Sequence, residues 1–136
     1  MSDFVVDASV AVKWFVAETD FLVADDLSAS NHRLFAPRLI MTEVANTLAR
    51  KAMAGLMSAA EACVYLRSLP HYFGGFLAVD ELIEPALKNV CAIRHPISDL
   101  IYLDAPLVTA DRRFIAKIAG TDFARHVMLL SDWRSE

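Results

Sequence analysis

The sequence predicts an α/β fold, a three-layer α/β/α sandwich around a central, mainly parallel sheet of about five strands. Short runs rich in β-branched residues alternate with longer helical patterns, as in a parallel sheet connected by crossover helices. The runs at 4–6 and 107–109 carry no charge, which is typical of strands covered on both faces. No linker, repeat or low-complexity tract divides the 136 residues, so we expect a single domain over residues 1–136.

Helix and strand signals follow in order through the first half of the chain. Pro37 suits the first turn of a helix, and Gly55 suits the position just past its end. These two residues bound the longest helical pattern in the sequence. The elements expected up to this point are a strand at 3–6, helices at 9–16 and 21–30, a strand at 34–36 and a helix at 38–54.

Helix-capping and helix-breaking residues divide the second half of the chain into separate elements. Ser58, followed three residues later by Glu61, forms a capping box that marks the start of a helix. Pro96 restarts a short helix. The elements expected here are helices at 58–69, 81–93, 97–103 and 112–119, and strands at 76–79, 107–109 and 127–130.

The composition limits the kinds of partner. Hydrophobic residues make up 56% of the chain, more than one small core can bury, so we expect a second copy or another protein to cover part of the surface. Asp7 and Lys13 interrupt the N-terminal apolar stretch, and no run reaches the roughly 18 apolar residues of a spanning helix. We therefore expect no membrane partner and, without a basic start and cleavage site, a cytoplasmic location.

Several classes of site have little support. Cys63 and Cys91 are expected to be buried thiols, and the four histidines have no metal-ligand spacing. The four glycines form no phosphate-binding loop. The formal charge of −4 argues against an unselective nucleic-acid binder but leaves a selective one open.

Four acidic residues are expected at one edge of the sheet. Asp7 and Asp111 leave the carboxyl ends of two predicted strands, where open α/β sheets bind their ligands. Glu43 lies in the second turn of the long helix, on a stripe with Asn46 and Arg50, and Asp99 lies near the start of the short helix. The sequence therefore predicts an acidic pocket.

Each acid also has a purely structural interpretation. Asp7 and Asp111 could cap the helices that follow them, and Asp99 could be a first-turn acid favoured by the helix dipole. Glu43 alone could be solvated helix surface. Structural caps would be scattered over both ends of the sheet, whereas all four acids are expected at one end, which favours a functional site.

Four motifs carry these acids in the same order as a known family. The motifs are Val5-Val6-Asp7-Ala8-Ser9, Pro37-x-Leu39-x-x-x-Glu43-x-x-Asn46-x-Leu48, His95-Pro96-Ile97-Ser98-Asp99-x-x-Tyr102 and Leu107-Val108-Thr109-Ala110-Asp111-Arg112-Arg113-Phe114. Together they resemble the motifs of PIN domains, and in particular of the VapC-type ribonuclease toxins of toxin–antitoxin pairs. The resemblance implies a Mg²⁺- or Mn²⁺-dependent endoribonuclease, usually a homodimer, that a cognate antitoxin holds inactive.

The resemblance also assigns roles to residues. Asp7, Glu43, Asp99 and Asp111 would be the metal-site and catalytic acids, and the supporting polar residues would be Ser9, Asn46 and Thr109. We add Lys13, Arg112 and Arg113 as candidates for contacts with RNA phosphates. The basic clusters at Arg38, Arg50-Lys51 and Arg112-Arg113 also have an interpretation as solvated helix surface.

The chemistry of such a site is consistent. Two carboxylates about 4 Å apart repel by about 4 kcal/mol at an effective dielectric of about 20, so the cluster needs a cation. Magnesium prefers oxygen ligands and keeps several waters, which suits an all-carboxylate site. The expected reaction is in-line attack on a phosphodiester by a water that the metal activates.

One spacing departs from the family, and two other functions remain open. Only 111 − 99 = 12 positions separate Asp99 from Asp111, whereas the family has a helix longer by roughly two turns here. Either the segment is truly shortened, which could misplace an acid, or a stretch is missing from the sequence. A shortened segment favours a PIN-fold binding module with weakened catalysis. The other alternative is a receiver-type signalling domain with Asp80 as phosphoacceptor.

Overall fold

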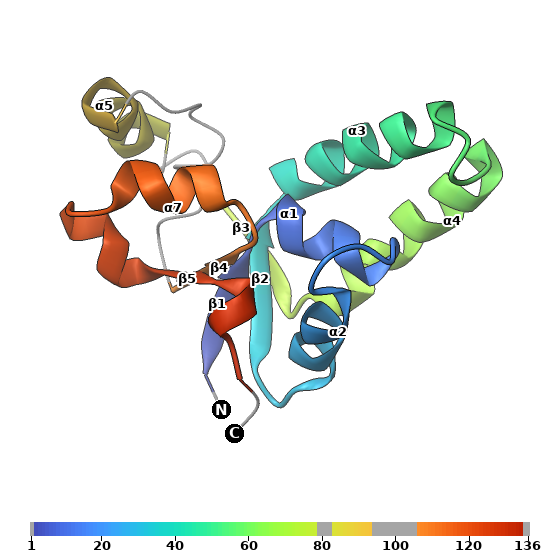
Figure 1. The fold of residues 1–136 in the computed structure, drawn as a ribbon, viewed down its shortest axis with the longest axis horizontal. Coiled ribbons are helices and arrows are strands. Elements are labelled where there is room, and N and C mark those ends of the chain that lie inside the picture. Colours follow the sequence, from blue (N-terminus) through green and yellow to red (C-terminus); the bar gives the residue numbers. More distant parts are fainter. Residues whose placement is uncertain (1, 79–82, 94–105, 135–136) are drawn as a thin grey trace.

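The structure is a computed structural model that describes residues 2–78, 83–93 and 106–134. Its described residues form a five-stranded sheet in the order β3-β2-β1-β4-β5, and every neighbouring pair is parallel. Helices flank this sheet, so the predicted three-layer α/β/α architecture is confirmed (Figure 1). The strands are β1 (Asp3–Val6), β2 (Arg33–Pro37), β3 (Gly75–Leu77), β4 (Leu107–Thr109) and β5 (Val127–Leu129).

Helices connect these strands, and several are followed by a short 3₁₀ turn. Figure 1 shows α3 and α4 as a hairpin that projects from the sheet, with α7 on the other side of the β1 carboxyl end. The α-helices are α1 (Ala8–Ala11), α2 (Phe21–Ala29), α3 (Leu39–Met53), α4 (Ala59–Ser68), α5 (Ile83–Ile93) and α7 (Arg112–Ile118). The 3₁₀ turns are η1 (Val12–Trp14), η2 (Leu69–Tyr72), η4 (Asp122–His126) and η5 (Leu130–Asp132).

Local hydrogen bonds fix the turn between α3 and α4. Gly55 adopts φ 81°, the left-handed conformation that favours glycine after a helix. The amide of Leu56 donates to the carbonyl of Lys51 at 3.0 Å, which closes a Schellman motif. The expected capping box is confirmed, because the Glu61 amide donates to Ser58 Oγ at 3.0 Å and the Ser58 amide donates to Glu61 Oε1 at 3.3 Å.

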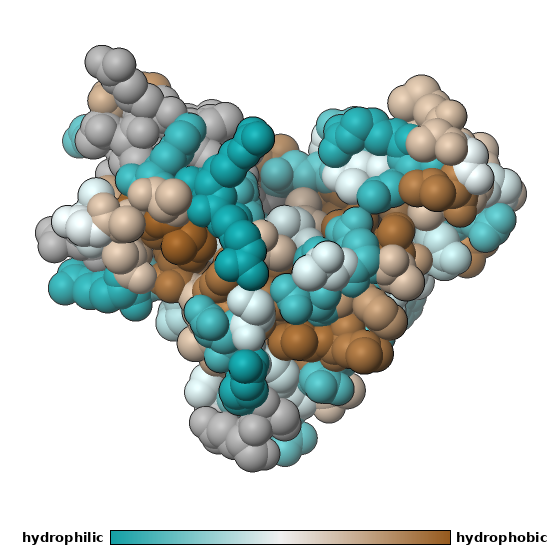
Figure 2. Space-filling view, in the orientation of Figure 1, coloured by the Kyte–Doolittle hydropathy of each residue, from teal (hydrophilic) through white to brown (hydrophobic). Residues whose placement is uncertain are grey.

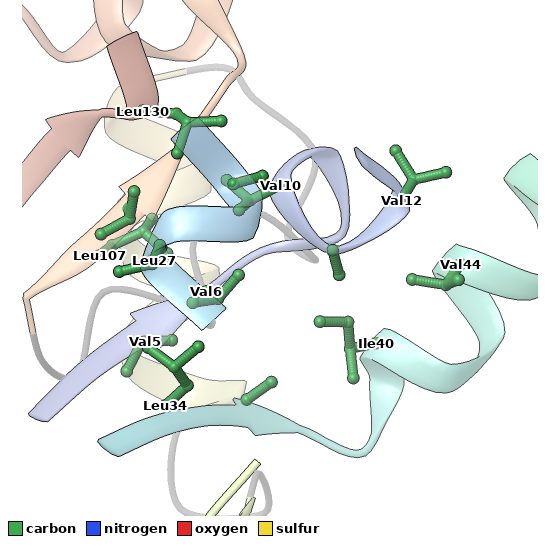
Figure 3. Packing of buried hydrophobic residues seen from close by; sticks show 14 of the residues in the cluster. Val5, Val6, Val10, Val12, Leu27, Leu34, Ile40, Val44, Leu107 and Leu130 are labelled. Carbon is green, nitrogen blue, oxygen red and sulfur yellow. The ribbon is translucent and has the colours of Figure 1, made fainter. Parts of the chain in front are cut away.

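The core lies between the sheet and the helices on it. Val5 and Val6 are at most 1% exposed; Val5 pairs with both β2 and β4, and Val6 pairs with β4. Ile40 and Val44, one turn apart on α3, point toward the β1–α1 segment (Figure 3). Each fully buried aliphatic side chain contributes about 1.5–3 kcal/mol, so this contact holds α3 against the end of β1.

Some expectations from the sequence were wrong in detail. Pro37 ends β2 and does not open α3, because it pairs with Leu77 of β3, and α3 begins at Leu39. The helix expected at 9–16 is divided into α1 and η1. Both cysteines are exposed, contrary to the expectation of buried thiols. The short helix at 97–103 falls outside the described residues.

None of the helices in residues 2–78, 83–93 and 106–134 combines the length and the apolar content needed to cross a bilayer.

Candidate functional site

The strand order reverses at the centre of the sheet. β1 is followed outward by β2 and β3 on one side, whereas β4 and β5 lie on the other. Ligands of open α/β sheets bind in the crevice outside the carboxyl ends of the strands at such a reversal. Val6 pairs with Val108 here, so Asp7, which follows β1, lies beside Thr109, the last residue of β4.

A cavity of about 490 Å³ occupies this crevice. Figure 2 shows the surface notched between α7 and the α3–α4 hairpin, with hydrophilic residues along the notch. Residues from the end of β1, from α3 and from the start of α7 share its wall. The lining residues are Asp7, Ala8, Ser9, Val12, Lys13, Glu18, Glu43, Asn46, Thr47, Arg50, Ala110 and Asp111.

Asp7 is held by hydrogen bonds to both of its carboxylate oxygens. It is 8% exposed, and its Oδ1 accepts from the Ser9 amide at 3.0 Å and from the Val10 amide at 3.3 Å. Its Oδ2 accepts from the hydroxyl of Thr109. The cap interpretation of Asp7 is therefore confirmed, and the same carboxylate also lines the cavity.

Two hydroxyl groups tie the ends of β1 and β4 together. Ser9 Oγ donates to Asp7 Oδ1 and accepts from the Ala110 amide at 2.9 Å. Thr109 Oγ1 accepts from the Asp111 amide at 3.0 Å while donating to Asp7. The two predicted supporting residues on these segments, Ser9 and Thr109, thus contact the acid that they were expected to support.

Asp111 caps α7 with one oxygen. The amides of Arg113 and Phe114 donate to its Oδ1 at 3.0 and 3.1 Å. A cap of this kind uses one carboxylate oxygen, so Oδ2 can still take part in binding a cation. The cap interpretation is confirmed for Asp111 too, and it coexists with a place in the cavity wall.

The α3 helix supplies the facing wall. Glu43, Asn46 and Arg50 all line the cavity, as the spacing of the polar stripe predicts. Thr47 lies on the same wall and accepts from Arg50 Nη2 at 3.1 Å. Glu43 therefore faces the same space as Asp7 and Asp111.

Glu18 joins the site although sequence patterns gave no reason to select it. It lies in the loop after η1, and its carboxylate pairs with Lys13 at 3.3 Å and with Lys51 at 3.1 Å. Burial raises the pKa of Glu18, but the hydrogen bond from Lys51 and the charge of Lys13 outweigh it and hold the pKa below its ordinary value. A spacing of five residues from Lys13 matches neither helical nor strand periodicity, so only the folded loop brings the pair together.

Not every predicted site residue lies in the cavity. Asp99 falls outside the described residues. Arg112 and Arg113 are exposed in the first turn of α7 and are not among the lining residues. In the part of the chain that the structure describes, no three His, Cys, Asp or Glu side chains lie close enough together to form a metal site.

The chain was compared with known proteins. No family model matches it, and no curated protein sequence matches it. Its fold is similar to the crystal structure of PAE2754 from Pyrobaculum aerophilum, with a TM-score of 0.67 over 96% of this chain and 93% of that chain. The sequence identity of 20% makes this a likeness of fold. The fold and site together define an α/β sandwich with an acid-lined cavity at the carboxyl ends of its strands.

Proposed function

We propose that this protein is a Mg²⁺- or Mn²⁺-dependent endoribonuclease that hydrolyses RNA phosphodiester bonds in this cavity. One observation gives this proposal its main support. Asp7, Glu43 and Asp111 come from three separate parts of the sequence and line a single cavity. A structural role for each acid alone gives no reason for this convergence.

The donor set suits a hard divalent cation. The cavity presents carboxylate oxygens together with the amide of Asn46 and the hydroxyl of Ser9, and among the described residues that line it there is no sulfur or imidazole ligand. Carboxylates brought close together repel one another, so a site that gathers them needs a cation. We propose that Asp7, Glu43 and Asp111 would hold such an ion, with Asp99 as the fourth acid.

Each residue has a distinct role in this proposal. Asp7, Asp99 and Asp111 would hold the cation, directly or through water, and Glu43 would orient the attacking water or bind a second ion. The chemistry that such an ion would supply is a lower pKa for water and compensation of the negative charge that builds on the phosphate. The hydrogen bonds from Ser9 and Thr109 fix the Asp7 carboxylate, so that its position does not depend on the substrate.

The choice of RNA as substrate and the toxin role rest on the resemblance of the four motifs to VapC-type PIN domains. By that resemblance the protein is a cytoplasmic toxin, forms a homodimer and is inhibited by a cognate antitoxin. An apolar groove of about 330 Å³ between α3 and α4 supports a protein partner on this hairpin. Met53 and Leu56, at 80% and 66% exposure, leave large apolar surface at its tip.

Cleavage of labelled single-stranded RNA with and without Mg²⁺ tests the function. Wild-type protein should cut the RNA only with the metal, and Asp7→Asn should lose at least a hundredfold of that activity, as expected for a group that acts on charge in the transition state. Asp3→Asn, at the opposite end of β1, is the matched control and should cut normally. Equal cleavage by Asp7→Asn and wild type would contradict the proposal.

The short interval of 12 positions between Asp99 and Asp111 favours one alternative, a PIN-fold module that binds RNA or a partner with weakened catalysis. That protein would bind Mn²⁺ or RNA without cutting it. A receiver domain fits less well. Receivers have the strand order 2-1-3-4-5, which places the acceptor strand beside β1, whereas β2 separates β3 from β1 here.

A further inference from the structure

Glu18 lies between two ammonium groups at one side of the cavity. Its Oε1 pairs with Lys13 Nζ at 3.3 Å, and its Oε2 pairs with Lys51 Nζ at 3.1 Å. Lys13 belongs to η1, Lys51 belongs to the last turn of α3, and Glu18 lies in the loop between η1 and α2. Three separate segments therefore meet in one ionic group.

This ionic group differs in kind from the carboxylates around it. Both oxygens of Glu18 are already engaged by cations, so a metal ion would have to displace an ammonium group to bind there. Glu18 lines the same cavity as Asp7 and Asp111. Because both of its oxygens contact lysines, Glu18 is suited to positioning those lysines and not to binding a metal ion.

Lys13 carries its positive charge in a largely buried position. Its side chain is only 10% exposed, and an ammonium group removed from water is costly unless it has partners. An ammonium group has three N–H donors, and the pairing with Glu18 uses one of them. Since Lys13 lines the cavity, the other donors can meet an anion that enters it.

The second lysine changes the charge balance. Glu18 alone would cancel the charge of Lys13, whereas two ammonium groups against one carboxylate leave an excess of one positive charge. Lys51 also provides Glu18 with a second partner while Lys13 contacts a ligand. The group therefore provides a fixed positive site beside the acids.

We propose that Glu18 is a positioning residue that holds Lys13 against one backbone phosphate of a bound RNA strand, with Lys51 preserving the positive charge of the group. This inference rests on the proposed ribonuclease function, because the carboxylates would act on a neighbouring phosphate. A pairing of lysine with phosphate then fixes the register of the strand in the cavity.

Binding of a short single-stranded RNA, followed by fluorescence anisotropy at several salt concentrations, tests the proposal. The measurements are made in an Asp111→Asn background to keep the probe intact. Lys13→Met should weaken binding about tenfold, the loss expected for one charge-assisted contact. It should also lower the slope of log K against log salt by about 0.7, the value for one phosphate on a single strand.

Glu18→Gln gives the sharpest contrast. Removing a negative charge from a site for a polyanion should tighten RNA binding if charge alone matters. If Glu18 positions Lys13, Glu18→Gln should instead weaken binding severalfold and should have no further effect in a Lys13→Met background. Tighter or unchanged binding by Glu18→Gln would overturn the proposal. Should that variant fail to fold, Glu18→Asp, one methylene shorter, should also bind more weakly than the parent protein.

Two further measurements separate this inference from the function on which it rests. Mn²⁺ affinity, by calorimetry in the otherwise wild-type protein, should be unchanged in Glu18→Gln; a large loss would identify Glu18 as a metal ligand and overturn the inference. Asp3→Asn with Arg33→Met removes an exposed ion pair at the other end of the sheet and should leave RNA binding unchanged. If wild type binds RNA as expected but does not cut it with Mg²⁺, the ribonuclease function fails and the phosphate site stands.

Discussion

The hydroxyl of Thr109 donates a hydrogen bond to the carboxylate of Asp7 across the junction of β4 and β1. Thr109 is fully buried, and the same hydroxyl accepts from the amide of Asp111. One side chain therefore links the two acids that leave neighbouring strand ends. This link makes the geometry of the cavity depend on the pairing of the two central strands.

Replacing Thr109 with valine tests this link. Thr109→Val keeps the shape of the side chain but removes the buried hydroxyl that donates to Asp7 Oδ2, which should lower the free energy of unfolding by about 1.5–3 kcal/mol. RNA cleavage should fall with it, because the Asp7 carboxylate loses its hydrogen bond to β4. Thr109→Ser retains the hydroxyl and should keep more activity; equal activity in the two variants would argue against the link. Urea unfolding and cleavage assays measure both effects.

Substitutions of Asp111 separate its two roles. Asparagine caps helices about as well as aspartate, so Asp111→Asn should leave stability nearly unchanged while reducing Mg²⁺-dependent cleavage strongly. Asp111→Ala should lose the same activity and, in addition, about 1 kcal/mol of stability through the lost cap. Thermal melts and cleavage assays on the two variants provide the comparison. If Asp111→Asn cleaved RNA as well as wild type, the helix cap would be the only role left for Asp111.

The turn between α3 and α4 should be sensitive to glycine replacement. Gly55→Ala forces an L-residue to φ 81° and should cost about 1–2 kcal/mol of unfolding free energy. No heavy atom would obstruct the added methyl group, so the cost comes from backbone conformation alone. RNA cleavage at a temperature well below the transition should be unaffected. A melting temperature equal to that of wild type would show that the Schellman turn does not limit stability.

Glu18 should contribute to the pH dependence of stability. Its pKa in the folded protein lies below the ordinary value of 4.5, so the unfolded chain binds a proton more readily. The contribution of Glu18 is therefore present above pH 4.5 and is lost as the pH falls through the lower pKa of the folded protein. Glu18→Gln should destabilise the protein at neutral pH and approach wild type in acid. A difference that persists unchanged in acid would contradict the ion-pair account.

The sequence predicted the parts of the fold that local patterns encode. The β-branched runs, the Ser58 capping box and the stop at Gly55 gave the strands and two helix ends, because each depends on neighbouring residues. The meeting of Asp7 and Asp111 followed from one rule about the carboxyl ends of parallel strands, and Glu43 and Asn46 followed from the polar stripe of the long helix. Ser9 entered through the family resemblance and also lies in the cavity wall.

Other features depend on tertiary contacts that a pattern does not record. Glu18 reaches Lys51 across 33 positions, so no local spacing could indicate it. Pro37 was assigned to a helix because the pairing of β2 with β3 at Leu77 is a long-range contact. The exposure of Cys63 depends on how α4 lies against α3, which the composition of α4 alone does not determine.

The most direct test of the central claim is a crystal structure of the protein soaked with Mn²⁺, with the ion located by its anomalous scattering. The account predicts a manganese peak in the cavity, coordinated by oxygens of Asp7 and Asp111, with Glu43 coordinating it directly or through water. It also predicts that the peak disappears in Asp7→Asn crystals. A cavity without manganese in well-soaked wild-type crystals, or a peak that persists in Asp7→Asn, would contradict the account.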